Sequence, residues 1–395
     1  LEAFNRETGE RVWRTYMVPK PGEPGSETWP DDGEAWQRGG GNCWVTPTYD
    51  PELNLIYQGT GNPCPDFDGA VREGDNLFTD SGVAVDADTG EIKAHFQYTP
   101  HDVWDYDSTM EHILFDLDGQ KLAAHFDKNG FMYILDRTNM EAVRVAPFVD
   151  RIDWGEVDEK GNVTPKVFPD KEGDPVHFWP GPAGAKEWTH ACYNPKTELL
   201  YAPVQDVGAT ATRRRREFKE SIPYWGAGVA VDLEDMAGSI SAFDPRTGQE
   251  RWRWRNDIPM CSSLLTTGGG LVFGGEPTGE FNAVDAESGD LLWQFQAGTG
   301  LHSPPSRYSI DGRLSNAVPT GWGAWPWPRR PARARRGAPS SGCRRRASIP
   351  SRRPGRARSA PGRPPCQGRP SASRCPSRPP RPSRSGRRTA PPAPA

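Results

Sequence analysis

The residues best suited to carry chemistry lie in one short acidic segment, from His101 to Asp107. It contains three carboxylates, with Trp104 and Tyr106 interleaved among them. If the segment is extended, Asp105 and Asp107 project from the same side of the backbone. When two carboxylates lie that close, the pKa of one of them rises unless a cation lies between them. Carboxylate oxygens of this kind are suitable ligands for calcium or another highly charged cation. The alternative interpretation is a solvated acidic loop with two packed aromatic residues.

Three further motifs contain residue types that bind cofactors or metals. The segment Gly59–Pro63 follows an apolar run and includes Asn62, whose side-chain oxygen can bind a metal; an ordinary strand-ending turn fits equally well. A glycine run leads into Trp44. This pattern fits a flat aromatic ligand that lies on the indole face, and it fits equally a flexible loop followed by a core Trp. Lys128 lies in a turn before an apolar strand, where a Lys is often only solvated.

A repeated pattern indicates which elements position these residues. Four segments have Asp or Asn, then Thr or Ser three residues later, then Gly; they start at Asn5, Asp86, Asp244 and Asp285. The first residue caps a tight turn and the Gly takes a positive φ. Alternating apolar runs flank the turns and indicate antiparallel strands. In three segments a Trp follows four residues after the Gly and is expected to pack against the neighbouring sheet, which favours a β-propeller over a β-sandwich.

Composition divides the chain near Trp327. Residues 329–395 contain 20 of the 48 Lys and Arg residues, no Asp or Glu, and almost no large apolar side chains. Such a segment cannot build a core, so we expect a disordered tail. It could be a basic arm for nucleic acid, or an out-of-frame translation of GC-rich DNA. The abrupt change after Trp325 favours the second interpretation.

The remaining part, residues 1–328, is strongly acidic. It has 28 basic and 52 acidic residues, a formal charge of −24. This charge argues against nucleic acid as a partner and favours a basic protein or bound cations. The sequence has no signal peptide, no transmembrane run, no CxxC pair and no haem-attachment motif. It begins at Leu1 inside a patterned segment, which we interpret as a truncated start.

Over residues 1–328 the order of these motifs resembles the alcohol and methanol dehydrogenases that depend on pyrroloquinoline quinone (PQQ). The likeness runs through VPKPGEPGSETW, GGGNCW, YDPELNLIYQGTGNP, REGDNLFTDSGVAVDADTG, TPHDVWDYD, DKNGFMYILDRT and TGGGLVFGG. The resemblance implies an all-β fold, a β-propeller of the eight-bladed quinoprotein type. This propeller is expected to be incomplete, because its N-terminal blades and its ring-closing strand lie outside the resemblance. The implied reaction is the oxidation of a primary alcohol to an aldehyde by bound PQQ.

The resemblance also implies roles for single residues. Asp105 matches the catalytic base, and Lys128 matches the basic residue beside the reactive quinone carbonyl. The implied metal ligands are Asn62, Asp105 and Asp107. Asp107 falls where rare-earth-dependent members have an additional ligand, so the ion is expected to be calcium or a lanthanide. Trp44 matches the Trp that stacks under the quinone.

Three more cofactor-binding residues follow from the resemblance: Asn42, Glu187 and Trp325. Asn42 stands where a Thr is common, and Glu187 replaces an Asn often found near the cofactor. The family's metal-ligand Glu and its adjacent-cysteine disulfide would lie before Leu1.

The resemblance further implies a small alcohol substrate, a basic c-type cytochrome as electron acceptor and a periplasmic location. Two alternatives stay open. The chain could be an inactive fragment of such an enzyme, which would account for both its start and its tail. It could also be a non-catalytic propeller scaffold of the cell envelope, but a scaffold has no reason to keep Asn62, Asp105 and Lys128 in this order.

Overall fold

The computed structural model of the chain describes residues 1–30, 34–169 and 171–321. The chain divides into two units, Leu1–Ser340 and Ser341–Ala395, and every described residue belongs to the first. The tail expected to be disordered, residues 329–395, lies outside the described residues, as does Trp325.

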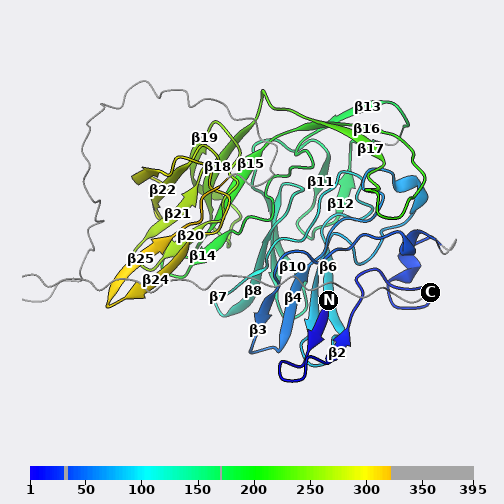
Figure 1. Ribbon diagram of the computed structural model, residues 1–395, viewed down its shortest axis with the longest axis horizontal. Helices are drawn as coiled ribbons and strands as arrows, with labels where there is room; N and C mark the ends of the chain where they lie inside the picture. Colours follow the sequence, from blue (N-terminus) through cyan, green and yellow to red (C-terminus); the bar gives the residue numbers. More distant parts are fainter. Residues whose placement is uncertain (31–33, 170, 322–395) are drawn as a thin grey trace, which may run out of the picture. The chain divides into compact units, whose positions relative to one another are not determined.

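Four antiparallel four-stranded sheets form most of the first unit (Figure 1). Sheet 1 contains β3 (Thr48–Asp50), β4 (Leu55–Gly59), β5 (Ser81–Asp86) and β6 (Ile92–Gln97). Sheet 2 contains β7 (Ile113–Leu117), β8 (Gln120–Phe126), β9 (Phe131–Asp136) and β10 (Ala142–Pro147). Sheet 3 contains β14 (Cys192–Asn194), β15 (Leu199–Asp206), β18 (Ala237–Phe243) and β19 (Glu250–Asn256). Sheet 4 contains β20 (Leu265–Thr267), β21 (Leu271–Gly275), β22 (Glu280–Asp285) and β23 (Leu291–Gln296).

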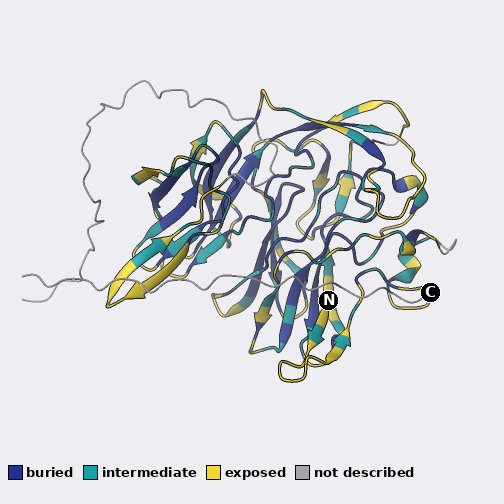
Figure 2. Cartoon of the chain, viewed as in Figure 1, coloured by how far each residue is buried: buried dark blue, intermediate teal, exposed yellow. Residues whose placement is uncertain are grey.

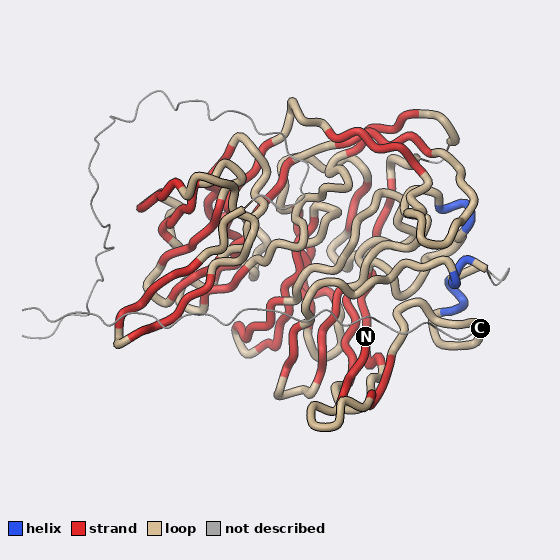
Figure 3. Tube along the Cα trace, in the orientation of Figure 1, coloured by secondary structure: helices blue, strands red, loops and turns tan. Residues whose placement is uncertain are grey.

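Smaller elements flank these sheets (Figure 3). The two-stranded sheets pair β1 (Glu2–Phe4) with β2 (Arg11–Arg14), β11 (Gly155–Val157) with β12 (Val163–Pro165), and β24 (Ser306–Ile310) with β25 (Arg313–Ala317). A three-stranded sheet contains β13 (Pro175–Phe178), β16 (Ala209–Arg213) and β17 (Ala227–Val231). The helices of the described ranges are the short 3-10 turns η1 (Ser26–Thr28), η2 (Ala35–Gln37) and η3 (Gly69–Val71). None of them is long and apolar enough to cross a membrane.

The core lies between consecutive sheets. One buried cluster joins Tyr57 and Ala84 of sheet 1 to Tyr133 of sheet 2, and similar clusters lie between sheets 2 and 3 and between sheets 3 and 4. The middle strands of the sheets are buried along most of their length, whereas the outer strands β6, β10 and β23 are largely intermediate or exposed (Figure 2). Each sheet is therefore stabilised by burial against its neighbours.

The predicted packing of the repeat Trp residues against a neighbouring sheet is confirmed for Trp13 and Trp252, whereas Trp293 contacts Phe281 and Phe295 of its own sheet. Trp252 of β19 donates its indole N–H to the carbonyl oxygen of Ala286, 3.1 Å away in the turn between β22 and β23. Its ring covers Gly289 in that turn, where φ is +76° and a Cβ would lie 2.5 Å from the indole. Trp13 of β2 makes the matching bond to Ala87 of sheet 1, at 3.0 Å. The repeat thus ties each of these sheets to the next one.

The topology gathers the chemically interesting loops at one end of the sheets. The first strands of consecutive sheets contact each other, β3 with β7, β7 with β14, and β14 with β20. Strand direction alternates within each sheet, so the β4–β5, β6–β7 and β8–β9 connections emerge at the same end. The capped repeat turns emerge at the opposite end. Residues 60–80, 98–112 and 127–130 are therefore neighbours because of the fold.

Candidate functional site

The acidic segment is a loop between β6 and β7, and it is not extended. The reason is the fully buried Asp102, whose carboxylate accepts the backbone N–H groups of Trp104 at 2.9 Å and Tyr106 at 3.0 Å. These bonds fold the chain tightly, and Asp105 adopts a positive φ of 65°. The side chains of Asp105 and Asp107 nevertheless reach a common partner, as described below.

The two aromatic residues of the loop fix its position. Trp104 and Tyr106 are both fully buried. The Trp104 indole N–H donates to the carbonyl oxygen of Val167 at 2.8 Å, and the Tyr106 hydroxyl donates to that of Pro180 at 2.6 Å. The packed aromatic residues of the alternative interpretation are therefore present, but they anchor a buried loop and not a solvated one.

The common partner is the ammonium group of Lys128, whose side chain is only 4% exposed. Its Nζ lies 3.1 Å from the carbonyl oxygen of Asp105, 3.2 Å from Asp107 Oδ2 and 3.4 Å from Glu187 Oε1. A carboxylate oxygen of Asp105 is 3.8 Å away. The structure thus brings together four of the residues predicted from the sequence, and Lys128 is not a solvated turn residue.

The turn that carries Lys128 is held by buried hydrogen bonds. Asp127 Oδ1 accepts the N–H of Asn129 at 3.0 Å, and His125 Nε2 lies 3.0 Å from Asp127 Oδ2. The carbonyl oxygen of Lys128 accepts the N–H of Ala185 at 3.1 Å. This framework fixes where the ammonium group lies before any ligand binds.

Asn62 joins the site from the β4–β5 loop. Its backbone N–H donates to Asp107 Oδ1 at 3.2 Å. A Cβ on the preceding Gly61 would lie 2.5 Å from the same oxygen, so the approach requires glycine there. The N–H of Gly61 donates to the carbonyl oxygen of Asn42 at 3.0 Å, while the residue Asn42 itself is exposed. Trp44, two residues further along, is 49% exposed, which leaves its indole accessible to a planar ligand.

One site residue was missed by the sequence analysis. Asp66 follows Asn62 by four residues, and its Oδ1 lies 3.5 Å from the Cys64 sulfur. Burial raises the pKa of Asp66 to about 6, against the lowering effect of the hydrogen bonds from Asn62 and Cys64. No motif marked Asp66, and only its closeness to Asn62 in sequence could have suggested it.

The site has more negative charge than Lys128 compensates. Burial raises the pKa of Asp105 well above its usual range, although Lys128 opposes the shift. Burial also raises the pKa of Glu187. Burial alone would lower the pKa of Lys128, but Asp105, Glu187 and Asp107 together raise it well above its usual value. A bound cation would relieve this imbalance.

These donors fit a hard cation in kind. Carboxylate and amide oxygens are the ligands that calcium and similar ions prefer, and such ions take about six to eight of them. Within the described ranges, no group of three or more His, Cys, Asp and Glu residues is arranged to hold a metal ion. Asn62, Asp105 and Asp107 contribute one amide and two carboxylate groups of this kind to the site.

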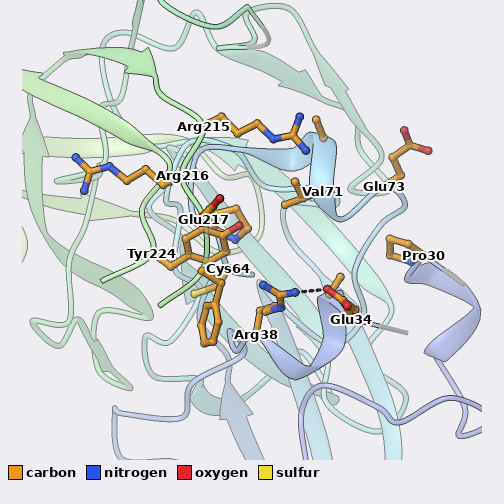
Figure 4. Close-up of a pocket in the computed structure, with 14 residues that line it drawn as sticks. Pro30, Glu34, Arg38, Cys64, Val71, Glu73, Arg215, Arg216, Glu217 and Tyr224 are labelled. Atoms are coloured by element: carbon orange, nitrogen blue, oxygen red, sulfur yellow. Dashed lines mark hydrogen bonds and ion pairs between the residues drawn. The ribbon is translucent and has the colours of Figure 1, made fainter. Parts of the chain in front are cut away.

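A cavity of about 720 Å³ borders this loop region (Figure 4). Cys64 lines it, and the Cys64 thiol also lies 3.5 Å from Asp66 Oδ1 on the side of the site. Arg38 forms an ion pair with Glu34 at the cavity wall and lies over the Phe218 ring, 5.1 Å from its centroid. The cavity thus adjoins the loop that carries Asn62.

Two family models match the chain. One is described as glucose/ethanol/alcohol dehydrogenase, beta-propeller domain, and matches residues 1–145. The other is described as outer membrane protein assembly factor BamB and matches residues 236–310. All the described site residues except Glu187 lie in the first of these ranges.

Individual proteins extend the likeness along the chain. A protein named quinoprotein alcohol dehydrogenase PedH, from Pseudomonas putida, is 39% identical over 354 residues, which cover 82% of this chain and 59% of that protein. Among solved structures, a europium-containing methanol dehydrogenase is 32% identical with a TM-score of 0.75, over 80% of this chain and 60% of the other. A quinohemoprotein alcohol dehydrogenase from Comamonas testosteroni is 36% identical with a TM-score of 0.75, over 82% of this chain and 52% of the other. This chain spans about three fifths of the length of the first of these relatives.

The charge arrangement predicts how the protein responds when Lys128 is replaced by Met. The change leaves buried carboxylates without their cation, so we expect the free energy of unfolding at pH 7 to fall by about 3–5 kcal/mol. The variant's carboxyl groups then have folded-state pKa values above their unfolded values, so the folded state binds more protons and the loss shrinks as pH falls from 7 towards 4. Urea unfolding across this pH range measures both effects. Replacing the exposed Lys160 by Met is the control, and equal stability of the two variants would contradict the assignment.

Proposed function

Since the chain belongs to the family of PQQ-dependent quinoprotein alcohol dehydrogenases, we propose that its site oxidises a primary alcohol to an aldehyde with the help of PQQ and a metal ion. The observation that carries the proposal is the convergence of Asp105, Asp107 and Glu187 on the buried ammonium group of Lys128. Burying so many charged groups is costly, and a purely structural propeller gains nothing from it.

The proposal assigns binding roles to the residues of the site. Asn62, Asp105 and Asp107 would hold the ion through their oxygen atoms. Trp44 would carry one face of the quinone on its accessible indole ring.

Four further residues are proposed to contact the quinone. Lys128 and Glu187 would do so from the buried side of the site, and Asn42 would do so from the loop paired with Gly61. Trp325 is proposed as a further contact, although it lies outside the described residues.

The chemistry follows from these positions. When bound, the ion would supply Lewis acidity and the quinone would supply a hydride acceptor for the alcohol. Asp105 would take the hydroxyl proton of the alcohol onto its carboxylate as general base. Lys128 would stabilise the negative charge that develops on the neighbouring carbonyl oxygen. Burial of Trp104 and Tyr106 keeps the loop of Asp105 fixed during the reaction.

The charge of the site bears on the choice of ion. Asp107 adds a carboxylate next to Asp105, and a trivalent ion compensates more of this charge than calcium does. We therefore propose a lanthanide as the preferred ion, with calcium as the alternative.

The electron acceptor is proposed from the charge of the whole acidic part. Residues 1–328 have a formal charge of −24, which would attract a soluble basic c-type cytochrome. The substrate would be a small alcohol and the location the periplasm, as in the family that the sequence resembles.

A scaffold role is the second candidate, and the match of residues 236–310 to the assembly-factor model supports it. That range contains none of the proposed site residues. The first candidate accounts for the charged site and the second does not.

Reconstitution tests the proposed activity. The full chain is incubated with PQQ and either lanthanum or calcium, and dye reduction is followed with ethanol as substrate. We expect alcohol-dependent reduction that falls by about 100-fold or more in Asp105→Asn, because the general base is lost. Asp75→Asn, an exposed carboxylate of the preceding loop, is the matched control. If the chain takes up no PQQ with either ion, it is an inactive fragment or a scaffold.

Replacing Asp107 by Ala tests the ion. The change removes one carboxylate ligand, and the more highly charged ion should lose more from it. We expect the lanthanum-supported rate of dye reduction to fall by a factor about 10–100 times larger than the calcium-supported rate. Rates measured at saturating concentrations of each ion give this ratio. Equal losses with both ions would count against a special role of Asp107.

A further inference from the structure

Lys186 and Glu111 form a buried ion pair that the proposed reaction does not use. The side chain of Lys186 has no exposed surface, and that of Glu111 is 8% exposed. The Lys186 ammonium group donates to Glu111 Oε2 at 3.1 Å. Burial lowers the pKa of Lys186, and the negative charge of Glu111 opposes this shift. An apolar pair of similar volume would fill the space without the cost of burying two charges, so packing alone does not account for them.

The ion pair lies next to Glu187, one of the carboxylates around Lys128. Besides its bond to Glu111, Lys186 Nζ donates to the backbone carbonyl oxygen of Glu187 at 3.3 Å. The ammonium group therefore restrains the residue from which the Glu187 side chain projects. That side chain places Oε1 3.4 Å from Lys128 Nζ, and its Oε2 accepts the backbone N–H of Trp188 at 3.3 Å. A chain of contacts thus leads from the ion pair through Glu187 to Lys128.

Glu111 fixes the same segment at a second point. Its Oε1 accepts the backbone N–H of Ala191 at 2.7 Å, so one carboxylate binds both Lys186 and Ala191. Glu111 belongs to the β6–β7 loop, which also carries Asp105. The ion pair therefore joins the segment that carries Glu187 to the acidic loop of the site.

The start of the segment packs directly on Lys128. The N–H of Ala185 donates to the carbonyl oxygen of Lys128 at 3.1 Å, and the carbonyl oxygen of Ala185 accepts the N–H of Gln205 at 2.8 Å. Gly184 has a φ of +76°, and a Cβ there would lie 2.7 Å from Lys128 Cγ. Residues 184–191 are therefore attached on both sides of Glu187, at Lys128 and at Glu111.

We propose that Lys186 and Glu111 are positioning residues, which hold Glu187 so that its carboxylate contacts Lys128. The inference rests on the proposed function, because that function assigns Glu187 and Lys128 to the quinone. Partners behind a binding residue commonly fix its orientation in this way. Lys186 acts through Glu187, so its effect on quinone affinity depends on the Glu187 side chain.

Crystal structures without quinone measure the position of Glu187 directly. The full chain is compared with its Lys186→Met variant. We expect Glu187 Oε1 to lie beyond about 4 Å from Lys128 Nζ in the variant, because the donor that restrains Glu187 is lost. An unmoved Glu187 carboxylate would overturn the inference.

Arg137→Met is the matched control for the loss of a buried ion pair. Arg137 Nε lies 2.7 Å from Asp50 Oδ2, and both side chains are less than a tenth exposed. Asp50 ends β3 and Arg137 follows β9, so this pair lies at the end of the sheets opposite the site. We expect Arg137→Met to leave Glu187 in contact with Lys128. Displacement of Glu187 in the control as well would show a general loss of structure and would count against the inference.

Quinone affinity measures the consequence for the site. PQQ is titrated into each chain at saturating lanthanum, and the quenching of Trp fluorescence gives the affinity. We expect Lys186→Met to weaken PQQ binding by about 10–100-fold, the effect of a lost contact to a charged group. Arg137→Met should bind PQQ like the parent chain. In a parent that binds PQQ, equal affinity of Lys186→Met would overturn the inference.

A double-mutant cycle with Glu187→Ala separates positioning from an independent effect. If Lys186 works through Glu187, adding Lys186→Met to the Glu187→Ala chain changes the PQQ affinity little further. If the two losses multiply, Lys186 acts on the quinone by another route, and the inference fails. Should Lys186→Met fail to fold, the paired variant Glu111→Leu/Lys186→Met takes its place, because it leaves neither charge buried alone. The same displacement and the same loss of affinity are expected of it.

Dye reduction judges the proposed function separately. A parent chain that binds no PQQ, or binds it and oxidises no alcohol, would refute the proposed function, and displacement of Glu187 in Lys186→Met would still support the inference. A chain that oxidises alcohol and keeps Glu187 on Lys128 in Lys186→Met would refute the inference alone.

Discussion

The contact of the Lys128 ammonium group with Asp105, Asp107 and Glu187 is the interaction on which the candidate site depends. A buried ammonium loses its hydration, and it is stable there only because carboxylates surround it. The same carboxylates would repel one another without it. The positions of the two loops and the turn that carry these groups therefore depend on the same charge compensation. The negative charge that Lys128 leaves uncompensated would attract a cation.

Strand topology and buried hydrogen bonds bring these charged groups together. Alternating strands deliver the β4–β5, β6–β7 and β8–β9 connections to one end of the sheets. Trp252 and its counterpart Trp13 tie sheets together at the opposite end, away from the charges. At the site, Asp102 and Arg72 link the loops through bonds to the backbone. Packing between the sheets thus stabilises the fold, and hydrogen bonds of buried polar groups fix the conformation of the loops.

Much of this could be predicted from the sequence. The capped turns and the packing of the repeat Trp follow from local patterns, because turn chemistry and side-chain size act over a few residues. The convergence of Asp105, Asp107, Lys128 and Glu187 followed from their order in the resemblance. The conformation of the acidic loop could not be predicted, because residue alternation does not reveal that the buried Asp102 accepts two backbone N–H groups. Asp66 was missed, because no motif of the sequence marked it.

The site is thus a group of oxygen donors with excess negative charge, held in place by one ammonium and by the backbone bonds of two buried side chains. Above all, we propose that Asn62, Asp105 and Asp107 hold a cation. Diffraction from crystals of the full chain soaked in lanthanum chloride locates such an ion by its anomalous signal. The account predicts one strong peak about 2.3–2.6 Å from oxygen atoms of these three residues. A peak elsewhere, or none at this position, would contradict it.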